Sequence, residues 1–213
     1  MKCDKKYMLL YAVTDRTWVG EKTLYQQVEE ALRGGVTCVQ LREKEMDDEE
    51  FLQEAKEIHA LCRQYSVPFI VNDNVEVAVA CGAEGIHVGQ EDMAAGDVRH
   101  RVGDGMIIGV SVHTVAEACE AVRSGADYLG LGAVFPTGTK TDVDQMSSET
   151  LRAICAAVDI PIVAIGGINR GNIGSLAGSG VDGAALVSAI FSASDIEETC
   201  RELRKLAEEM VGA

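Results

Sequence analysis

Eight short, nearly all-apolar runs that alternate with helix-like segments predict that residues 1–213 form a single-domain (β/α)8 TIM barrel of the α/β class. Runs of this kind are typical of the buried strands of a parallel sheet. The segments between them repeat apolar residues at helical spacing, as crossover helices do. An open dinucleotide-binding sheet is disfavoured, because the first run leads into Val13–Thr17 and not into a glycine fingerprint.

The strands follow one another at regular distances along the chain. They are expected at 8–13, 38–41, 68–71, 85–88, 106–110, 128–131, 161–165 and 183–187. One helix is expected from the apolar spacing of Leu24, Val28 and Leu32, and another over 51–62. A glycine, a small residue and an acidic residue precede several strands, and glycine there suits the left-handed turn that ends a helix.

Composition narrows the class of partner and the compartment. The 19 basic and 34 acidic residues give a net charge of -15, which disfavours nucleic acid and anionic membranes as partners. Seven scattered cysteines without a C-x-x-C pair, and the lack of a signal peptide or long apolar span, favour a cytoplasmic protein whose cysteines are small core residues. Small-molecule substrates are therefore expected, and a homo-oligomer stays open.

The loop after the sixth expected strand combines hydroxyls, glycine and lysine. Thr137, Thr139 and Lys140 offer hydroxyl donors and a cation, and Gly138 allows close approach of the backbone. A phosphate or a diphosphate needs such donors. The same residue types also occur in solvated turns, so this loop alone leaves both interpretations open.

The end of strand two is basic on one side. Period-two alternation places Gln40, Arg42 and Lys44 on the same side of the chain. The arginine can bind phosphoryl oxygens through two N–H groups at once, and the lysine can bind them as a compact positive charge. Glu43 is interpreted as part of an exposed loop.

Strands three and four each end in a carboxylate, at Asp73 and Asp92. Two neighbouring carboxylates beside a basic anion site suit Mg2+, which takes one or two carboxylates together with substrate phosphates. The alternative is that both aspartates cap helices. As a pair, they favour the metal interpretation.

The remaining strand ends supply small and polar groups. Ser111 and His113 share one side of strand five, while Thr114 is expected to cap the next helix and His87 to be a hydrogen-bonded core residue. Backbone amides at 166–167 and 187–188 match the frequent phosphate site of this fold. Two anion sites indicate two phosphorylated substrates or one sugar bisphosphate, and thus a phosphate-handling barrel enzyme.

Seven motifs in order carry a more specific resemblance. They lie at 40–44, 72–73, 88–92, 109–111, 135–140, 165–168 and 187–190. Through them the chain resembles the thiamine phosphate synthase family over nearly its whole length. The resemblance implies a transferase of thiamine biosynthesis that condenses 4-amino-2-methyl-5-hydroxymethylpyrimidine diphosphate with 4-methyl-5-(2-phosphoethyl)thiazole, or its carboxylated form. Thiamine phosphate and pyrophosphate would form by Mg2+-assisted dissociative substitution without a protein nucleophile.

The resemblance also implies roles for individual residues. The implied substrate-binding residues are Gln40, Leu41, Arg42, Glu43, Lys44, Asn72, Ser111, Thr137, Gly138, Thr139, Lys140, Gly167, Val187 and Ser188. Those implied to act in catalysis are Arg42, Lys44, Ser111 and Lys140, and those implied to hold the cofactor Mg2+ are Asp73 and Asp92. The thiazole phosphate would lie against the threonines of the 137–139 loop and the groups at 167 and 187–188.

Three alternatives differ in what they require. A thiazole phosphate tautomerase, a relative of the family, typically loses the metal carboxylates and part of the basic motif, whereas Asp73, Asp92 and Lys44 are present here. A phosphosugar isomerase or epimerase on the same fold would need an acid and base pair across the barrel. A regulator that only binds a phosphorylated metabolite would need only one anion site. The loops after strands one and two are candidates for closure, because they are long and polar.

Overall fold

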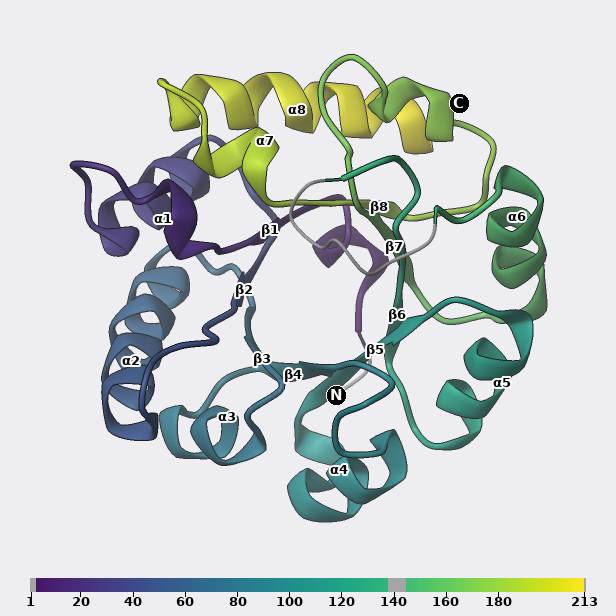
Figure 1. The fold of residues 1–213 in the computed structure, drawn as a ribbon, viewed down its shortest axis with the longest axis horizontal. Coiled ribbons are helices and arrows are strands. Elements are labelled where there is room, and N and C mark those ends of the chain that lie inside the picture. The colour runs from purple at the N-terminus through teal and green to yellow at the C-terminus, as the bar shows by residue number, and fades with distance from the viewer. Residues whose placement is uncertain (1–2, 138–144, 213) are drawn as a thin grey trace.

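A closed barrel of eight parallel strands forms the centre of the molecule, in the order in which the strands occur along the chain. The computed structural model describes residues 3–137 and 145–212. The strands are β1 (Leu10–Val13), β2 (Cys38–Leu41), β3 (Phe69–Asn72), β4 (Gly85–Val88), β5 (Ile107–Val112), β6 (Tyr128–Leu131), β7 (Ile162–Ile165) and β8 (Gly183–Leu186). β8 pairs with β1 and closes the ring, which Figure 1 views from one end. The predicted fold is confirmed.

Helices surround the barrel as an outer layer (Figure 1). They are α1 (Leu24–Arg33), α2 (Asp48–Gln64), α3 (Val75–Cys81), α4 (Ala95–Val102), α5 (Val115–Arg123), α6 (Ser148–Ala157), α7 (Ser188–Phe191) and α8 (Ile196–Val211). Thr114 caps α5 as predicted, because its side chain accepts a hydrogen bond from the Glu117 amide. No helix in the described part of the chain combines the length and hydropathy needed to cross a membrane.

Short 3-10 turns complete the fold: η1 (Lys5–Tyr7), η2 (Arg16–Trp18), η3 (Gly103–Gly105) and η4 (Ile173–Leu176). The connection from β7 to β8 contains η4 where the other crossovers contain an α-helix. Glycines at 171, 174, 178 and 180 lower the helix propensity of this segment. The long α8 packs over it instead.

Apolar side chains form two layers, one inside the barrel and one between the strands and the helices. In β2, Cys38 belongs to the inner layer, whereas Val39 and Leu41 belong to the outer one. This alternation is what the pleat of a barrel strand requires. Tyr11 and Tyr128 fill much of the inner layer and are almost fully buried. The barrel is therefore packed below its mouth.

At the amino-terminal end of the barrel, four side-chain hydrogen bonds, called clamps below, join the strands in pairs. The residue just before each even-numbered strand accepts, through its side chain, an amide hydrogen from near the start of the preceding odd-numbered strand. Each of these bonds is 2.9 Å long, and they join Thr37 to Leu10, Glu84 to Phe69, Asp127 to Ile108 and Asp182 to Ile162. The recurring acidic position that precedes several strands thus has a structural role, away from the opposite end where barrel sites lie.

Candidate active site

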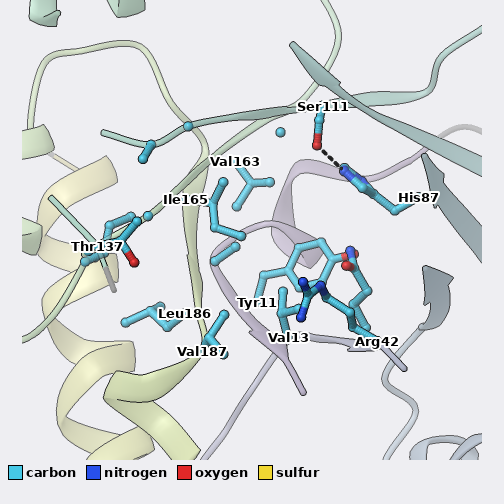
Figure 2. A pocket seen from close by; sticks show the side chains of 18 of the residues that line it. Tyr11, Val13, Arg42, His87, Ser111, Thr137, Val163, Ile165, Leu186 and Val187 are labelled. Atoms are coloured by element: carbon cyan, nitrogen blue, oxygen red, sulfur yellow. Dashed lines mark hydrogen bonds between the residues drawn. The ribbon is translucent and has the colours of Figure 1, made fainter. Parts of the chain in front are cut away.

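A cavity opens where the strands end, on the side of the barrel that carries active sites in this fold. Its volume is about 160 Å3, close to that of an engineered cavity of about 150 Å3 that binds benzene. In Figure 2, Ser111 and His87 lie across the pocket from Thr137, Leu186 and Val187, with the apolar side chains of Val163 and Ile165 between them. One planar ring fits such a space.

The cavity collects most of the side chains that the family motifs imply for substrate binding. The implied residues that line it are Gln40, Arg42, Asn72, Ser111, Thr137, Gly167, Val187 and Ser188. Leu41 differs, because its side chain is buried in the outer apolar layer and lines neither this cavity nor the outer pocket described below. Gly138, Thr139 and Lys140 lie outside the described residues.

A buried chain of hydrogen bonds forms the polar floor of the cavity. Gln40 Nε2 donates to the Tyr11 hydroxyl at 2.8 Å, and the hydroxyls of Tyr11 and Tyr128 are 2.8 Å apart. His87 lies 2.9 Å from the Tyr128 hydroxyl through Nδ1 and 2.9 Å from Ser111 Oγ through Nε2. Four strands thus support the serine from below.

The first member of this chain fixes the direction of its first bond. An amide nitrogen can only donate, so the Tyr11 oxygen accepts from Gln40. Every member is then satisfied if Tyr11 donates to Tyr128, Tyr128 to His87 Nδ1, and His87 Nε2–H to the serine. In this arrangement the Ser111 proton can point into the cavity, where it suits a hydrogen-bond acceptor of a ligand.

Gly109 makes room for the centre of this chain. A Cβ at this position would lie 2.1 Å from Cζ and 2.4 Å from the hydroxyl of Tyr128. Burial raises the pKa of both Tyr11 and Tyr128 well above the ordinary tyrosine value, so both hydroxyls stay protonated. His87 is confirmed as a hydrogen-bonded, largely buried residue, and it also lines the cavity.

A second, outer pocket adjoins the first between the loops that follow β2, β3 and β4. Lys44, Asp73 and Met93 contribute to its wall, and Asn72 lines both spaces. A ligand with a ring in the cavity and an anionic tail would enter the outer pocket past Asn72. The lysine there supplies a positive charge for that tail.

Glu43 lies in the wall of this outer pocket, and the prediction that it begins an exposed loop is wrong. Its side chain is only 3% exposed, and its Oε2 accepts a hydrogen bond of 2.8 Å from Arg16 Nε. Arg16 Nη2 also donates to Glu54 in α2, at 2.6 Å. Burial raises the pKa of Glu43 to about 7, against the opposing effect of the arginine.

Neither metal candidate is a helix cap, because Asn74 caps α3 and the N-cap of α4 is Ala94. Asp73 adopts a left-handed backbone with φ of 62°, an unusual conformation for a residue other than glycine. Asp92 Oδ2 accepts from the Gly89 amide at 2.7 Å. The described residues contain no cluster of three or more metal-binding side chains. Asp73 in the wall of the outer pocket and Asp92 next to Met93 of that wall offer oxygen ligands of the kind that Mg2+ takes together with waters.

Backbone groups shape the wall of the inner cavity near Thr137. Gly167 has φ of +65°, and a Cβ there would lie 2.3 Å from the Pro136 carbonyl oxygen. This close approach draws the segment before Thr137 against the β7 loop. The helix α7 begins at Ser188, and Val187 and Ser188 both line the cavity.

Sequence reasoning missed the part that Tyr11, Tyr128 and the Arg16–Glu43 pair play in the site. The inward parity of β1 and β6 could have identified the two tyrosines, because they alternate in phase with residues that line the cavity. His113 does lie where its parity with Ser111 predicts, at the cavity wall, with Nδ1 2.8 Å from the Gly132 carbonyl oxygen.

Comparison with known proteins gives consistent matches. A family model described as thiamine monophosphate synthase matches residues 10–190. A thiamine-phosphate synthase of Clostridium tetani is 48% identical over 194 residues, which are 91% of this chain and 93% of the relative. One from Pyrococcus abyssi is 45% identical over 208 residues, 98% of this chain and 99% of the relative. The solved structure of a thiamine phosphate pyrophosphorylase from Pyrococcus furiosus has a TM-score of 0.90 at 41% identity, covering 98% of this chain and 99% of that chain.

Proposed function

This chain belongs to the thiamine monophosphate synthase family, and we propose that it is a thiamine phosphate synthase. The enzyme joins the hydroxymethylpyrimidine diphosphate to the thiazole phosphate, or its carboxylated form, and releases pyrophosphate. The observation that carries the proposal is the joining of a ring-sized cavity to a lysine-bearing outer pocket at Asn72. The relatives compared above carry the synthase name, and the alternatives of a tautomerase, an isomerase or a regulator are not favoured.

The pyrimidine ring of the first substrate occupies the cavity in this proposal. Ser111 donates its hydroxyl proton to an acceptor on the ring, and Gln40 borders the same floor. Val163 and Ile165 supply an apolar wall that excludes water from the reacting carbon. Positioning of this kind supplies a large part of the rate in a reaction that needs no protein nucleophile.

The diphosphate extends from the cavity, where Arg42 and Asn72 bind its oxygens, into the outer pocket, where Lys44 binds them. When the bond between the methylene carbon and the diphosphate oxygen breaks, negative charge grows on the leaving group. Fixed positive groups stabilise that charge, and this electrostatic contribution is usually the largest in such sites. The thiazole nitrogen then attacks the methylene cation.

Asp73, in the wall of that pocket, and Asp92, next to Met93 of the same wall, would hold Mg2+, because they offer the hard oxygen ligands that this ion prefers. When bound, the ion supplies further positive charge against the leaving diphosphate. At the opposite wall, Thr137, Gly167, Val187 and Ser188 would bind the thiazole phosphate. From the family motif, Thr139 and Gly138 would join them, and Lys140 would face the pyrophosphate.

We further propose that residues 1–213 act as one catalytic domain, because a single closed sheet carries the described site residues. Seven unpaired cysteines support a reducing, cytoplasmic location. The charge of -15 supports small molecules, not nucleic acid, as partners.

The test is a direct assay of the purified chain with both phosphorylated substrates and Mg2+. Thiamine phosphate and pyrophosphate are expected in equal amounts, and omission of either substrate should abolish both. A folded protein that forms neither product would contradict the proposal.

A further inference from the structure

The pairing between β1 and β2 continues past the sheet through three consecutive side chains, Thr14, Asp15 and Arg16. The last backbone bond of this ladder runs from the Thr14 amide to the Gln40 carbonyl oxygen, at 3.0 Å. One step further, the Thr14 hydroxyl accepts the Arg42 amide hydrogen at 3.0 Å. The hydroxyl thus takes the place of a strand carbonyl, and the loop after β2 stays in register with the loop after β1.

Asp15 makes the second contact between these loops. Its Oδ2 lies 3.6 Å from Arg42 Nη1, and both side chains are only 14% exposed. A single long contact of this kind holds one corner of the guanidinium group. Among residues 3–137 and 145–212 no other hydrogen bond or ion pair holds the guanidinium group, so its remaining donors can face the cavity that Arg42 lines.

Arg16 makes the third and strongest set of contacts. It donates to Glu43 at 2.8 Å, to Glu54 of α2 at 2.6 Å and to the sulfur of Met46 at 3.3 Å. An ion pair on the surface contributes little to the stability of a protein. The Glu43 side chain, however, is almost fully buried. Its Oε1 has no hydrogen-bond partner within the described ranges, so Arg16 is the main compensation for a desolvated carboxylate.

The position of Glu43 decides where its neighbours point. Consecutive side chains point to opposite sides of an extended chain, so a Glu43 side chain held against α2 turns Arg42 toward the cavity, and it also fixes the backbone from which Lys44 projects. Arg42 lines the cavity, whereas Glu43 and Lys44 both line the outer pocket. We propose that Arg16 is a positioning residue that, by holding Glu43 against Glu54, aims Arg42 and Lys44 at the diphosphate of the first substrate. This role rests on the proposed function and adds to it a residue from outside both pockets.

The test compares Arg16→Ala with Arg123→Ala, a matched arginine in an exposed pair with Glu120 of α5. Arg16→Ala should raise KM for the pyrimidine diphosphate about 10- to 100-fold, the range expected when charged groups lose their alignment, and change KM for the thiazole phosphate less than about twofold. Binding of pyrophosphate with Mg2+, measured by calorimetry, should weaken in parallel. Arg16→Lys should restore part of the loss, because a lysine can compensate Glu43 but cannot bind both carboxylates as a fork. Arg123→Ala should match the wild type.

The outcomes separate this inference from the proposed function. A wild-type protein that makes no thiamine phosphate contradicts the function itself. An active wild type whose Arg16→Ala variant keeps both KM values, or raises both equally, overturns the positioning role. If Arg16→Ala does not fold, the same measurements are made on Arg16→Lys and Glu43→Gln. Pyrophosphate affinities equal to that of the wild type in both variants would also overturn the positioning role.

Discussion

Replacing Tyr128 by phenylalanine removes a single oxygen from the middle of the buried hydrogen-bond chain. That oxygen is 2.8 Å from the Tyr11 hydroxyl and 2.9 Å from His87 Nδ1. Both partners are largely buried, at the floor of the cavity. The substitution keeps the aromatic ring, so its packing against Gly109 is retained.

The magnitude follows from the two groups that lose a partner. Each buried polar group left without a hydrogen bond costs about 1–3 kcal/mol, so the free energy of unfolding should fall by about 2–6 kcal/mol. For a chain of this size, about 2–4 °C of melting temperature is lost per kcal/mol, which predicts a decrease of about 4–24 °C. The turnover number should fall too, because His87 would no longer hold Ser111 in one orientation.

Urea unfolding and thermal melting of Tyr128→Phe measure this cost, with Tyr25→Phe as the matched control. Tyr25 lies on α1 and is 38% exposed. Its substitution should change stability by less than about 0.5 kcal/mol. If the two variants were equally stable, the buried chain would not contribute as argued, and the direction of donation toward Ser111 would lose its basis.

Three further predictions concern the metal, the glycine wall and pH. Asp92→Ala should lose turnover that added Mg2+ partly restores, because one of two proposed carboxylate ligands is gone; a rate and metal dependence equal to those of the wild type would refute the ligand role. Gly167→Ala should cost about 1–3 kcal/mol and raise KM for the thiazole phosphate, because its left-handed backbone and the Pro136 oxygen both oppose a Cβ. Gly96→Ala, with open space around it in α4, should be neutral or stabilising, and equal losses in both glycine variants would contradict the reasoning. The pKa of Glu43 rises from 4.5 to about 7 on folding, so the folded state binds the proton more tightly and the stability contributed by this group is lost as pH rises through that window. Glu43→Gln should remove this decline in urea unfolding at pH values from about 4.5 to about 7, and parallel curves for the two proteins would argue against it.

The strands could be predicted from sequence because each is a short apolar run between turn residues, as 85–88 and 128–131 illustrate. Parity along a strand also placed Ser111 and His113 on the cavity side. Glu43 could not be placed in this way, because its burial depends on Arg16, 27 positions earlier, and on Glu54 in a different element. Local pattern describes one strand at a time, whereas the buried chain under Ser111 exists only once β1, β2, β4, β5 and β6 are in register.

The side-chain clamps at the amino-terminal end give the barrel a repeat of two strands. A cut or insertion in α1, α3, α5 or the η4 segment separates an acceptor from the amide that it caps in the preceding strand. A cut in α2, α4 or α6 leaves all four clamps intact within their own fragments. A break in α4 would divide the chain into two halves that each keep two clamped pairs, with Arg42 and Asp73 in one and Ser111 and Ser188 in the other. Circular permutation or reassembly from fragments should therefore succeed at these junctions sooner than within a pair.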